Sequence, residues 1–162
     1  MRDYQKYATI VAVFATVLFA ALLVAAFGMV SLVTNLDVIA DREVGTLVGP
    51  TMSAAVVLLV FVMMLLLGVN TPPEKQRVAV GWSLATGAGA FVLYVVTGVV
   101  LVGASDGDAV GAMLFGGAMV VNPFALTAGI LAFVVTLVYS ILLASHYGEN
   151  GRPLWPWERR GE

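Results

Sequence analysis

The chain has 162 residues, of which 60% are hydrophobic and 11% are charged, and its net charge at pH 7 is −2. Soluble domains are roughly 45–50% apolar and about 25% charged, so this composition argues against an ordinary soluble fold. The slightly acidic balance excludes a basic surface for nucleic acid. The sequence has no cysteine and one histidine, His146, which excludes disulfides, thiolate catalysis and a His-rich metal site.

Four apolar stretches predict an all-α membrane protein with four transmembrane helices, because each stretch approaches or exceeds the roughly 20 residues that a spanning helix needs. The first, about 8–33, is much longer than the core of a secretory signal peptide, so we expect it to be a retained anchor. The second, about 50–70, opens at Pro50, and proline suits a first helical turn. The third covers about 78–102, after a turn that contains two prolines.

The fourth apolar region contains no charge from Ala109 to Ser145, and it is too long for one straight span. Asn122-Pro123 divides it, so we place the fourth span at about 123–145. The preceding segment, 109–121, would be about 20 Å long as a helix, too short to cross a bilayer. We expect an interfacial or re-entrant segment there, and a kinked extension of the fourth helix is the remaining alternative.

Basic residues predict the orientation of the four spans. By the positive-inside rule, the ends of the chain and the middle turn face the cytoplasm, and the helices form two hairpins with both termini inside. The other two loops hold Arg42 as their one basic residue. The basic residues of the predicted cytoplasmic side are Arg2, Lys6, Lys75, Arg77, Arg152, Arg159 and Arg160.

The tail, 146–162, is predicted to be a cytoplasmic segment at the membrane surface. Its tryptophan rings favour the headgroup level, and its arginines suit an anionic leaflet. A simple interfacial anchor and a docking motif for another subunit both fit this pattern. The residues that carry it are Arg152, Trp155, Trp157, Arg159 and Arg160.

Charge is missing from all four predicted spans, which hold no Asp, Glu, Lys, Arg or His. Ion-coupled transporters and voltage sensors rely on such residues at membrane depth, so we expect neither activity from this chain alone. The same absence removes any acid–base pair from the membrane interior, and we expect no enzyme activity. A b-type haem would need two axial ligands, and we expect no cofactor and no metal.

Small residues at four-residue spacing predict where helices approach closely. The third predicted helix carries Gly81, Ala85 and Gly89, and the fourth carries Ala125 and Gly129. The simpler interpretation is that the two stripes pack against each other inside the bundle. The alternative is that one of them faces a second protein.

Three short motifs connect the chain with a known family. TNLDVIAD follows the first predicted helix, VGP opens the second, and YGENGRPLWPWE closes the chain. Together they resemble an uncharacterised family of small four-helix membrane proteins from Actinobacteria. The resemblance implies a protein of the bacterial plasma membrane and brings no catalytic residues.

These observations favour a non-catalytic accessory or assembly subunit of a larger membrane complex. By analogy with small subunits of actinobacterial respiratory assemblies, a respiratory complex is one candidate partner. A small oligomeric channel or facilitator is the alternative, and it would use the 109–121 segment. The expected partners are membrane lipids and either other membrane subunits or further copies of the chain, with no nucleic acid.

Overall fold

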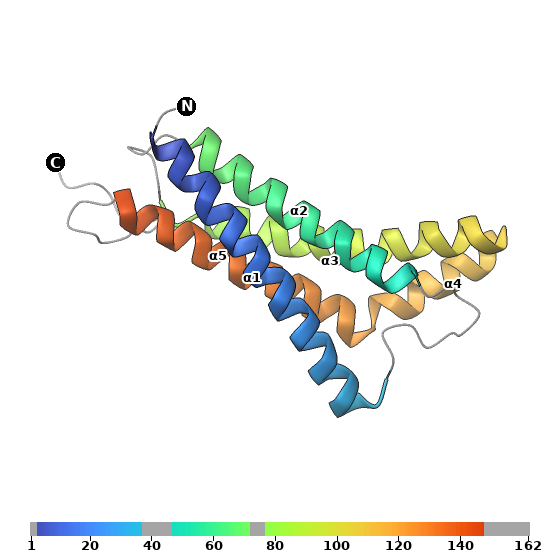
Figure 1. Ribbon diagram of the computed structural model, residues 1–162. Helices are drawn as coiled ribbons and strands as arrows, with labels where there is room; N and C mark the ends of the chain where they lie inside the picture. The colour runs from blue at the N-terminus through green and yellow to red at the C-terminus, as the bar shows by residue number, and fades with distance from the viewer. Residues whose placement is uncertain (1–2, 37–46, 72–76, 148–162) are drawn as a thin grey trace.

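The computed structural model describes residues 3–36, 47–71 and 77–147, except for the side chains of 106 and 147. Over these residues the chain is helical with no strand, which confirms the predicted all-α class. Four of the helices are long and apolar enough to cross a membrane, so the chain is a multi-pass membrane protein by length and composition. The helices are α1 (Asp3–Thr34), α2 (Val48–Asn70), α3 (Val80–Asp106), α4 (Ala109–Val120) and α5 (Pro123–Tyr147) (Figure 1).

A two-residue turn joins α3 to α4. Gly107 ends α3 with a φ of 67°, a left-handed conformation that glycine adopts without a steric penalty, and its N–H donates to the carbonyl of Gly103. Asp108 then caps α4, because its Oδ1 accepts from the Val110 N–H at 3.0 Å. The chain therefore reverses direction within these two residues.

The predicted break at Asn122-Pro123 separates α4 from α5. The Oδ1 atom of Asn122 accepts from the Phe124 N–H at 2.9 Å and caps the new helix. Pro123 is the first residue of α5, where its missing N–H has no helical partner to lose. Proline also disfavours helical geometry at the residue before it, so the uncharged region forms two helices.

Both α4 and α5 run antiparallel to α3, one after the other along its length (Figure 1). Gly103 of α3 lies against Ala112 of α4, and nearer the start of α3, Gly87 lies against Gly129 of α5. The 109–121 segment was predicted to be interfacial or re-entrant. It is a 12-residue helix, Ala109–Val120, that leads into α5, and its position relative to the membrane stays a prediction. Hydropathy reports only how apolar a segment is, so it does not distinguish an interfacial segment, a re-entrant segment and a kinked extension of the fourth helix.

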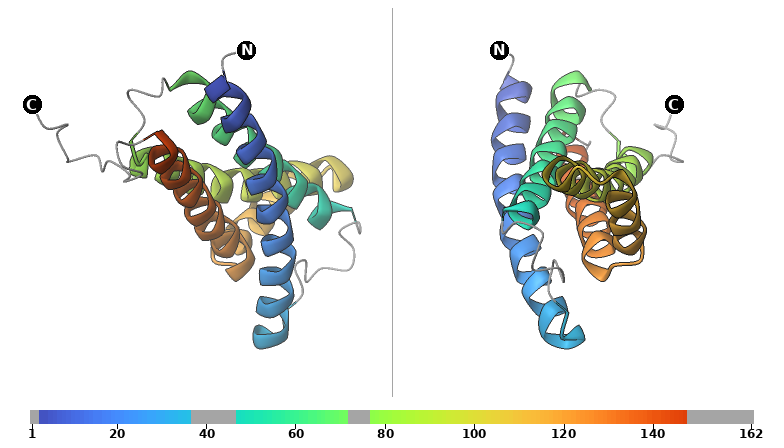
Figure 2. Two further views of the ribbon diagram at one scale, coloured as in Figure 1. Left: turned by 60° about the vertical axis from the view of Figure 1, so that its left-hand side comes forward. Right: turned by 90° about the vertical axis from the view of Figure 1, so that its right-hand side faces the viewer.

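The other two helices, α1 and α2, cover one side of the α3–α5 pair (Figure 2). The start of α1 and the end of α5 lie at the same end of the bundle, where the Tyr7 and His146 rings stack with centroids 4.0 Å apart. The end of α1 diverges from the α3–α4 turn (Figure 1). The bundle is therefore closed at the end with Tyr7 and His146 and forked at the other.

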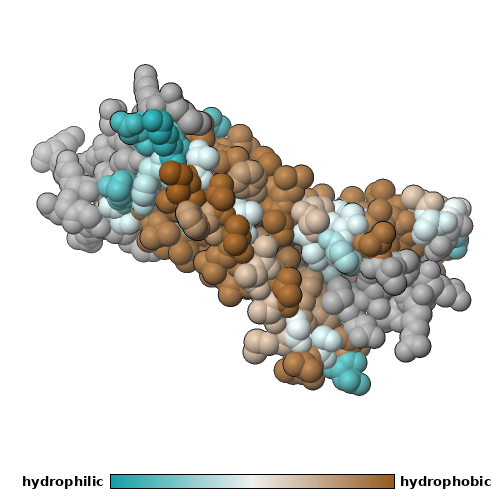
Figure 3. All heavy atoms as spheres, viewed as in Figure 1, coloured by the Kyte–Doolittle hydropathy of each residue, from teal (hydrophilic) through white to brown (hydrophobic). Residues whose placement is uncertain are grey.

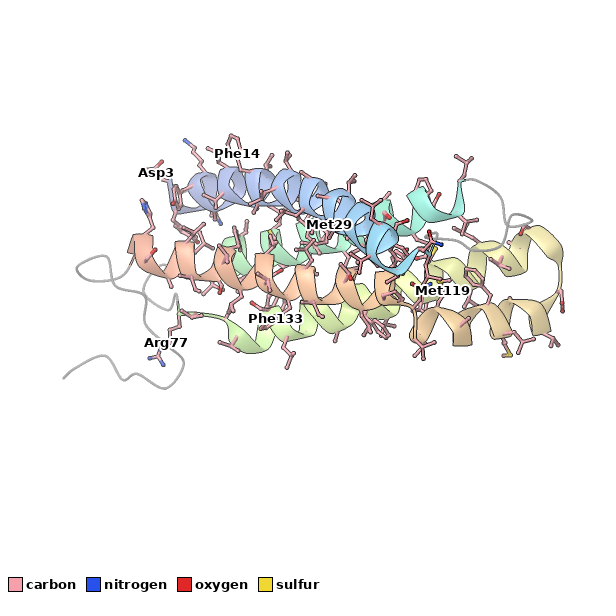
Figure 4. All side chains as sticks on the ribbon, turned by 90° about the horizontal axis from the view of Figure 1, so that it is seen from below. Asp3, Phe14, Met29, Arg77, Met119 and Phe133 are labelled. Carbon is pink, nitrogen blue, oxygen red and sulfur yellow. The ribbon has the colours of Figure 1, made fainter. Side chains whose placement is uncertain are left out.

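Apolar side chains lie both inside and outside the bundle. One face of α2 is fully buried at every fourth residue: Met52, Val56, Val60 and Met64. The outward side chains are equally apolar, and Phe14 of α1 and Leu58 of α2 are 72% and 63% exposed (Figure 4). On the face seen in Figure 3, hydrophobic residues cover most of the coloured surface, and the most hydrophilic residues lie near the ends. This distribution suits a bundle surrounded by lipid.

We predict that Gly87→Ala destabilises the bundle. A Cβ at this position would lie 2.8 Å from both the Gly129 carbonyl oxygen and the Phe133 Cβ, so α3 and α5 would have to separate. Overpacking of this kind costs about 1–3 kcal/mol. We expect a lower midpoint of thermal unfolding in detergent. The midpoint is measured by size-exclusion chromatography of samples heated to a series of temperatures.

The matched control is Gly81→Ala on the same helix. A Cβ at Gly81 would meet no heavy atom within 4 Å, and alanine is the better helix former. We expect its midpoint to equal or exceed that of the wild type. Equal midpoints for the two variants would contradict the packing of α3 on α5.

Candidate functional site

Charged side chains lie near the helix ends in the described part of the chain. Lys6 and Asp3 form an exposed i,i+3 pair at 3.8 Å in the first turns of α1. Asp108 caps α4, and the four spans predicted from sequence contain no charged residue. Within residues 3–36, 47–71 and 77–147, no group of three or more His, Asp or Glu side chains could hold a metal ion.

Hydroxyl groups provide most of the buried polarity among the described residues. Ser83 and Thr86 of α3 and Thr136 and Ser140 of α5 are buried between apolar side chains. Ser83 and Thr86 donate to carbonyls four residues earlier in their own helix, as the sequence predicts for isolated hydroxyls in a span. Ser140 also accepts from the Ala79 N–H at 3.3 Å, which joins the start of α3 to α5.

Two buried hydroxyls differ from this pattern. Thr136 Oγ1 and Tyr94 Oη form no hydrogen bond with another described protein group. Tyr94 lies among aromatic rings, with Phe27 of α1 at a centroid distance of 5.9 Å, and Phe27 in turn meets Phe124 of α5 at 5.3 Å. Both pairs are edge-to-face, an arrangement that aromatic rings favour. This cluster joins α1, α3 and α5 near the base of the fork.

A tyrosine joins three helices at the opposite end of the bundle. The buried Tyr139 hydroxyl donates to the Ala8 carbonyl at 3.1 Å, which ties α5 to α1. A Cβ on Gly68 of α2 would collide with this hydroxyl and would lie 2.9 Å from the Ala8 Cβ. Tyr7 precedes Ala8 in the sequence, and its ring stacks nearly parallel to that of His146, with an angle of 14° between the rings.

The small residues singled out in the sequence divide between the inside and the outside of the bundle. On α5, Ala125 is fully buried and Gly129 meets α3. On α3, Gly89 lies 3.5 Å from Leu59 of α2, measured from a Cβ built on the glycine. Gly81 and Ala85 are exposed on the outer surface. The structure therefore pairs Gly129 with Gly87, and not with the predicted stripe of α3.

Several predicted positions lie outside the described residues. They are the tail residues Arg152, Trp155, Trp157, Arg159 and Arg160 and the basic residues Arg2 and Lys75. The interfacial tail remains a prediction, and so does the orientation that the basic residues indicate.

Sequence reasoning missed three contacts between helices: Gly87 with Gly129, Tyr139 with Ala8, and the Trp82 Nε1–H with the Met63 carbonyl at 3.0 Å. Gly87 had a usable signal, since it lies in the small-residue segment 85–90. The other two had none, because each joins residues that only the packing of helices brings together.

The fold and the buried groups define a helical multi-pass membrane protein, and its described residues present no charged group inside the spans. The whole chain, residues 1–162, matches the model of a family described as "Family of unknown function (DUF6121)". The chain belongs to this family. This confirms the predicted membership of an uncharacterised family, while the actinobacterial origin stays a prediction.

The two other comparisons gave no relatives: no curated protein and no solved structure matches the chain. Any functional assignment therefore rests on the residues and contacts described above.

We predict different outcomes for two buried hydroxyls on α5. Tyr139→Phe removes the donor to the Ala8 carbonyl and should lower the free energy of unfolding by about 0.5–1.5 kcal/mol. Thr136→Val keeps the side-chain shape and removes a hydroxyl that has no protein partner, so stability should be unchanged or higher. Unfolding by denaturant in mixed micelles measures both.

Thr127→Val serves as the control for replacing a threonine by valine on α5. Its hydroxyl donates to the Pro123 carbonyl at 2.7 Å, so the control removes a bond that Thr136 lacks. If Thr136→Val were the most destabilising of the three variants, the assignment of its hydroxyl as unpaired would be wrong.

Proposed function

We propose that the chain is a non-catalytic accessory or assembly subunit that packs against another integral membrane protein. The observation that carries this proposal is an outward small-residue face at the start of α3, formed by Gly81, Ala85 and Ala88. All three are exposed, and a Cβ on Gly81 would meet nothing within 4 Å.

Contacts inside the chain supply the reason to expect a partner at this face. Where α3 meets α5, it does so through Gly87 and Gly129, and it meets α4 through Gly103 and Ala112. Helices in lipid associate through close van der Waals packing, which small residues permit. Further along α3 the outward residues are larger, namely Val92, Val96 and Val100. In side-chain size, the small outward face is therefore closer to the helix contacts inside the chain than to the outward surface further along α3.

The buried hydroxyls of the described residues support a non-catalytic role. The hydroxyls of Ser83 and Thr86 donate hydrogen bonds to carbonyls of their own helix, so neither is paired with a base. A nucleophile needs an adjacent base to be activated. The closed junctions at Gly87–Gly129 and Tyr139–Ala8 also disfavour a water path through one copy. The alternative function, a channel, would therefore need a pore between several copies.

The proposed topology is two hairpins, α1–α2 and α3–α5, in the bacterial plasma membrane with both ends of the chain in the cytoplasm. The positive-inside rule supports this orientation. Gly81 is near the start of α3, and Ser140, near the end of α5, accepts from the Ala79 N–H. The small outward face and the start of the 146–162 tail therefore belong to the same end of the bundle, so one partner could contact both.

The test is purification of the tagged chain from its own host in a mild detergent, with identification of the proteins that remain bound in stoichiometric amount. We expect a larger membrane protein to accompany the wild type. The double substitution Gly81→Leu with Ala85→Leu should reduce its recovery at least tenfold, because the bulky side chains would hold the partner helix away.

The control is Val92→Leu with Val96→Leu, which changes outward residues of α3 by one methylene each and should leave recovery unchanged. Loss of the partner in both double variants would show that the small outward face is not the partner's specific binding site. A homogeneous assembly of this chain with no other protein would overturn the accessory role and favour the channel. Ion flux in liposomes would then be measured.

A further inference from the structure

The outer surface of α4 is apolar around its exposed circumference. Ala112, Gly116 and Met119 are buried on one side of the helix. Val110, Met113 and Leu114 of α4 and Val121 just beyond its end are exposed, with Met113 at 76% and Leu114 at 72%. No polar side chain occurs from Ala109 to Val121. Exposing this surface to water would be unfavourable, because the free energy rises in proportion to the apolar area exposed.

The sizes of the side chains indicate which apolar neighbour covers α4. Two of the residues that face α3 are small, since Ala112 meets Gly103 and a Cβ on Gly116 would meet Val99, while the larger Phe115 fits against Gly98. The outward residues Met113 and Leu114 are long and flexible. Close helix contacts in membranes favour small residues, whereas acyl chains adapt to any apolar shape. The outward face of α4 therefore has the character of a lipid-facing surface.

The outward face of α4 also continues an apolar belt. Val96 and Val100 expose apolar side chains along α3, and Leu126 and Ile130 do so along α5. Figure 3 shows hydrophobic residues extending along the molecule toward the α3–α4 turn. The belt thus runs without a charged residue from the lipid-facing part of α5 to Asp108 at the start of α4.

The length of α3 limits how this apolar belt can lie within a bilayer. α3 has 27 residues and is about 40 Å long at 1.5 Å per residue. The hydrocarbon core is about 30 Å thick, so an upright α3 would leave the α3–α4 turn outside it. A tilt of about 40°, or a thicker bilayer, brings the whole helix within the core.

We propose that α4 is embedded in lipid, with acyl chains covering Val110, Met113, Leu114 and Val121. The boundary of the hydrocarbon then lies at the α3–α4 turn, and α4 is an intramembrane extension of α5. The surface binds lipid chains by shape and apolar contact, and its fit depends on bilayer thickness. This proposal concerns a different face from the small outward face of α3 and stands without the accessory role.

The chain is suited to a direct test because it has no native cysteine. Single cysteines replace Met113 or Leu114, carry a nitroxide label, and are studied in the purified full chain in phosphatidylcholine bilayers. Collision rates are measured with oxygen, which concentrates in lipid, and with a water-soluble nickel chelate. Leu58→Cys, at a position 63% exposed on α2, is the lipid reference, and Asp3→Cys, at the start of α1, is the aqueous reference.

We expect Met113→Cys and Leu114→Cys to match the lipid reference, with oxygen collisions several-fold more frequent than nickel collisions. Frequent nickel collisions, as at Asp3, would place α4 in water and overturn the proposal. Low rates with both reagents would mean that protein covers α4, which also overturns it, and crosslinking would then identify a second copy.

A second measurement varies the thickness of the bilayer. At Val110→Cys, next to Asp108, nickel accessibility should fall several-fold when short-chain phosphatidylcholine is replaced by a long-chain form. Leu58→Cys should show little change, because it lies far from the helix ends. Equal and high nickel accessibility of Val110→Cys in both bilayers would contradict a hydrocarbon boundary at the turn.

Discussion

Close backbone contact between α3 and α5 is the constraint on which the rest of the bundle depends. A Cβ on Gly129 would lie 3.1 Å from the Gly87 carbonyl oxygen, so neither position has room for a side chain without a shift. Lipid offers little hydrophobic drive for helices to associate, and close packing has to supply the attraction. With α5 fixed on α3, the short break at Asn122 directs α4 along the second half of α3. Gly98 and Gly103 there leave space for Phe115 and Ala112.

The outline of this arrangement could be predicted from sequence because its causes are local. The number of spans follows from the length and hydropathy of each stretch, and the break at Asn122-Pro123 follows from proline chemistry. The direction of α4 could not be predicted, because an apolar segment of 12 residues has the same composition whether it lies flat, turns back or packs on a neighbour.

The choice of face on α3 could not be predicted either. Gly87 is two positions from both Ala85 and Gly89, and two residues correspond to about 200° around a helix of 3.6 residues per turn. The four-residue spacing of Gly81, Ala85 and Gly89 therefore marks a side of α3 nearly opposite to the side that meets α5. Small residues occur on both sides of α3, and spacing alone gives no preference. On α5 they gather on one side, and Ala125 and Gly129 are buried there.

The two small-residue sides of α3 connect the fold with the proposed role. One side is used inside the chain, where Gly87 and Gly103 admit α5 and α4. The other, with Gly81 and Ala85, is exposed, and a Cβ on Gly81 would meet no heavy atom within 4 Å, although this side has the same chemistry. A surface selected only to contact lipid has no need of glycine, which lowers helix stability by about 0.5–1 kcal/mol relative to alanine. Gly28 of α1 and Gly117 of α4 are also exposed, so a single glycine does not mark a partner site. Gly81 differs because it lies on one side of α3 with Ala85 and Ala88, and this grouping is better explained by a helix that approaches closely. The role that we propose is therefore association, in which the outer surface would divide between lipid and a partner.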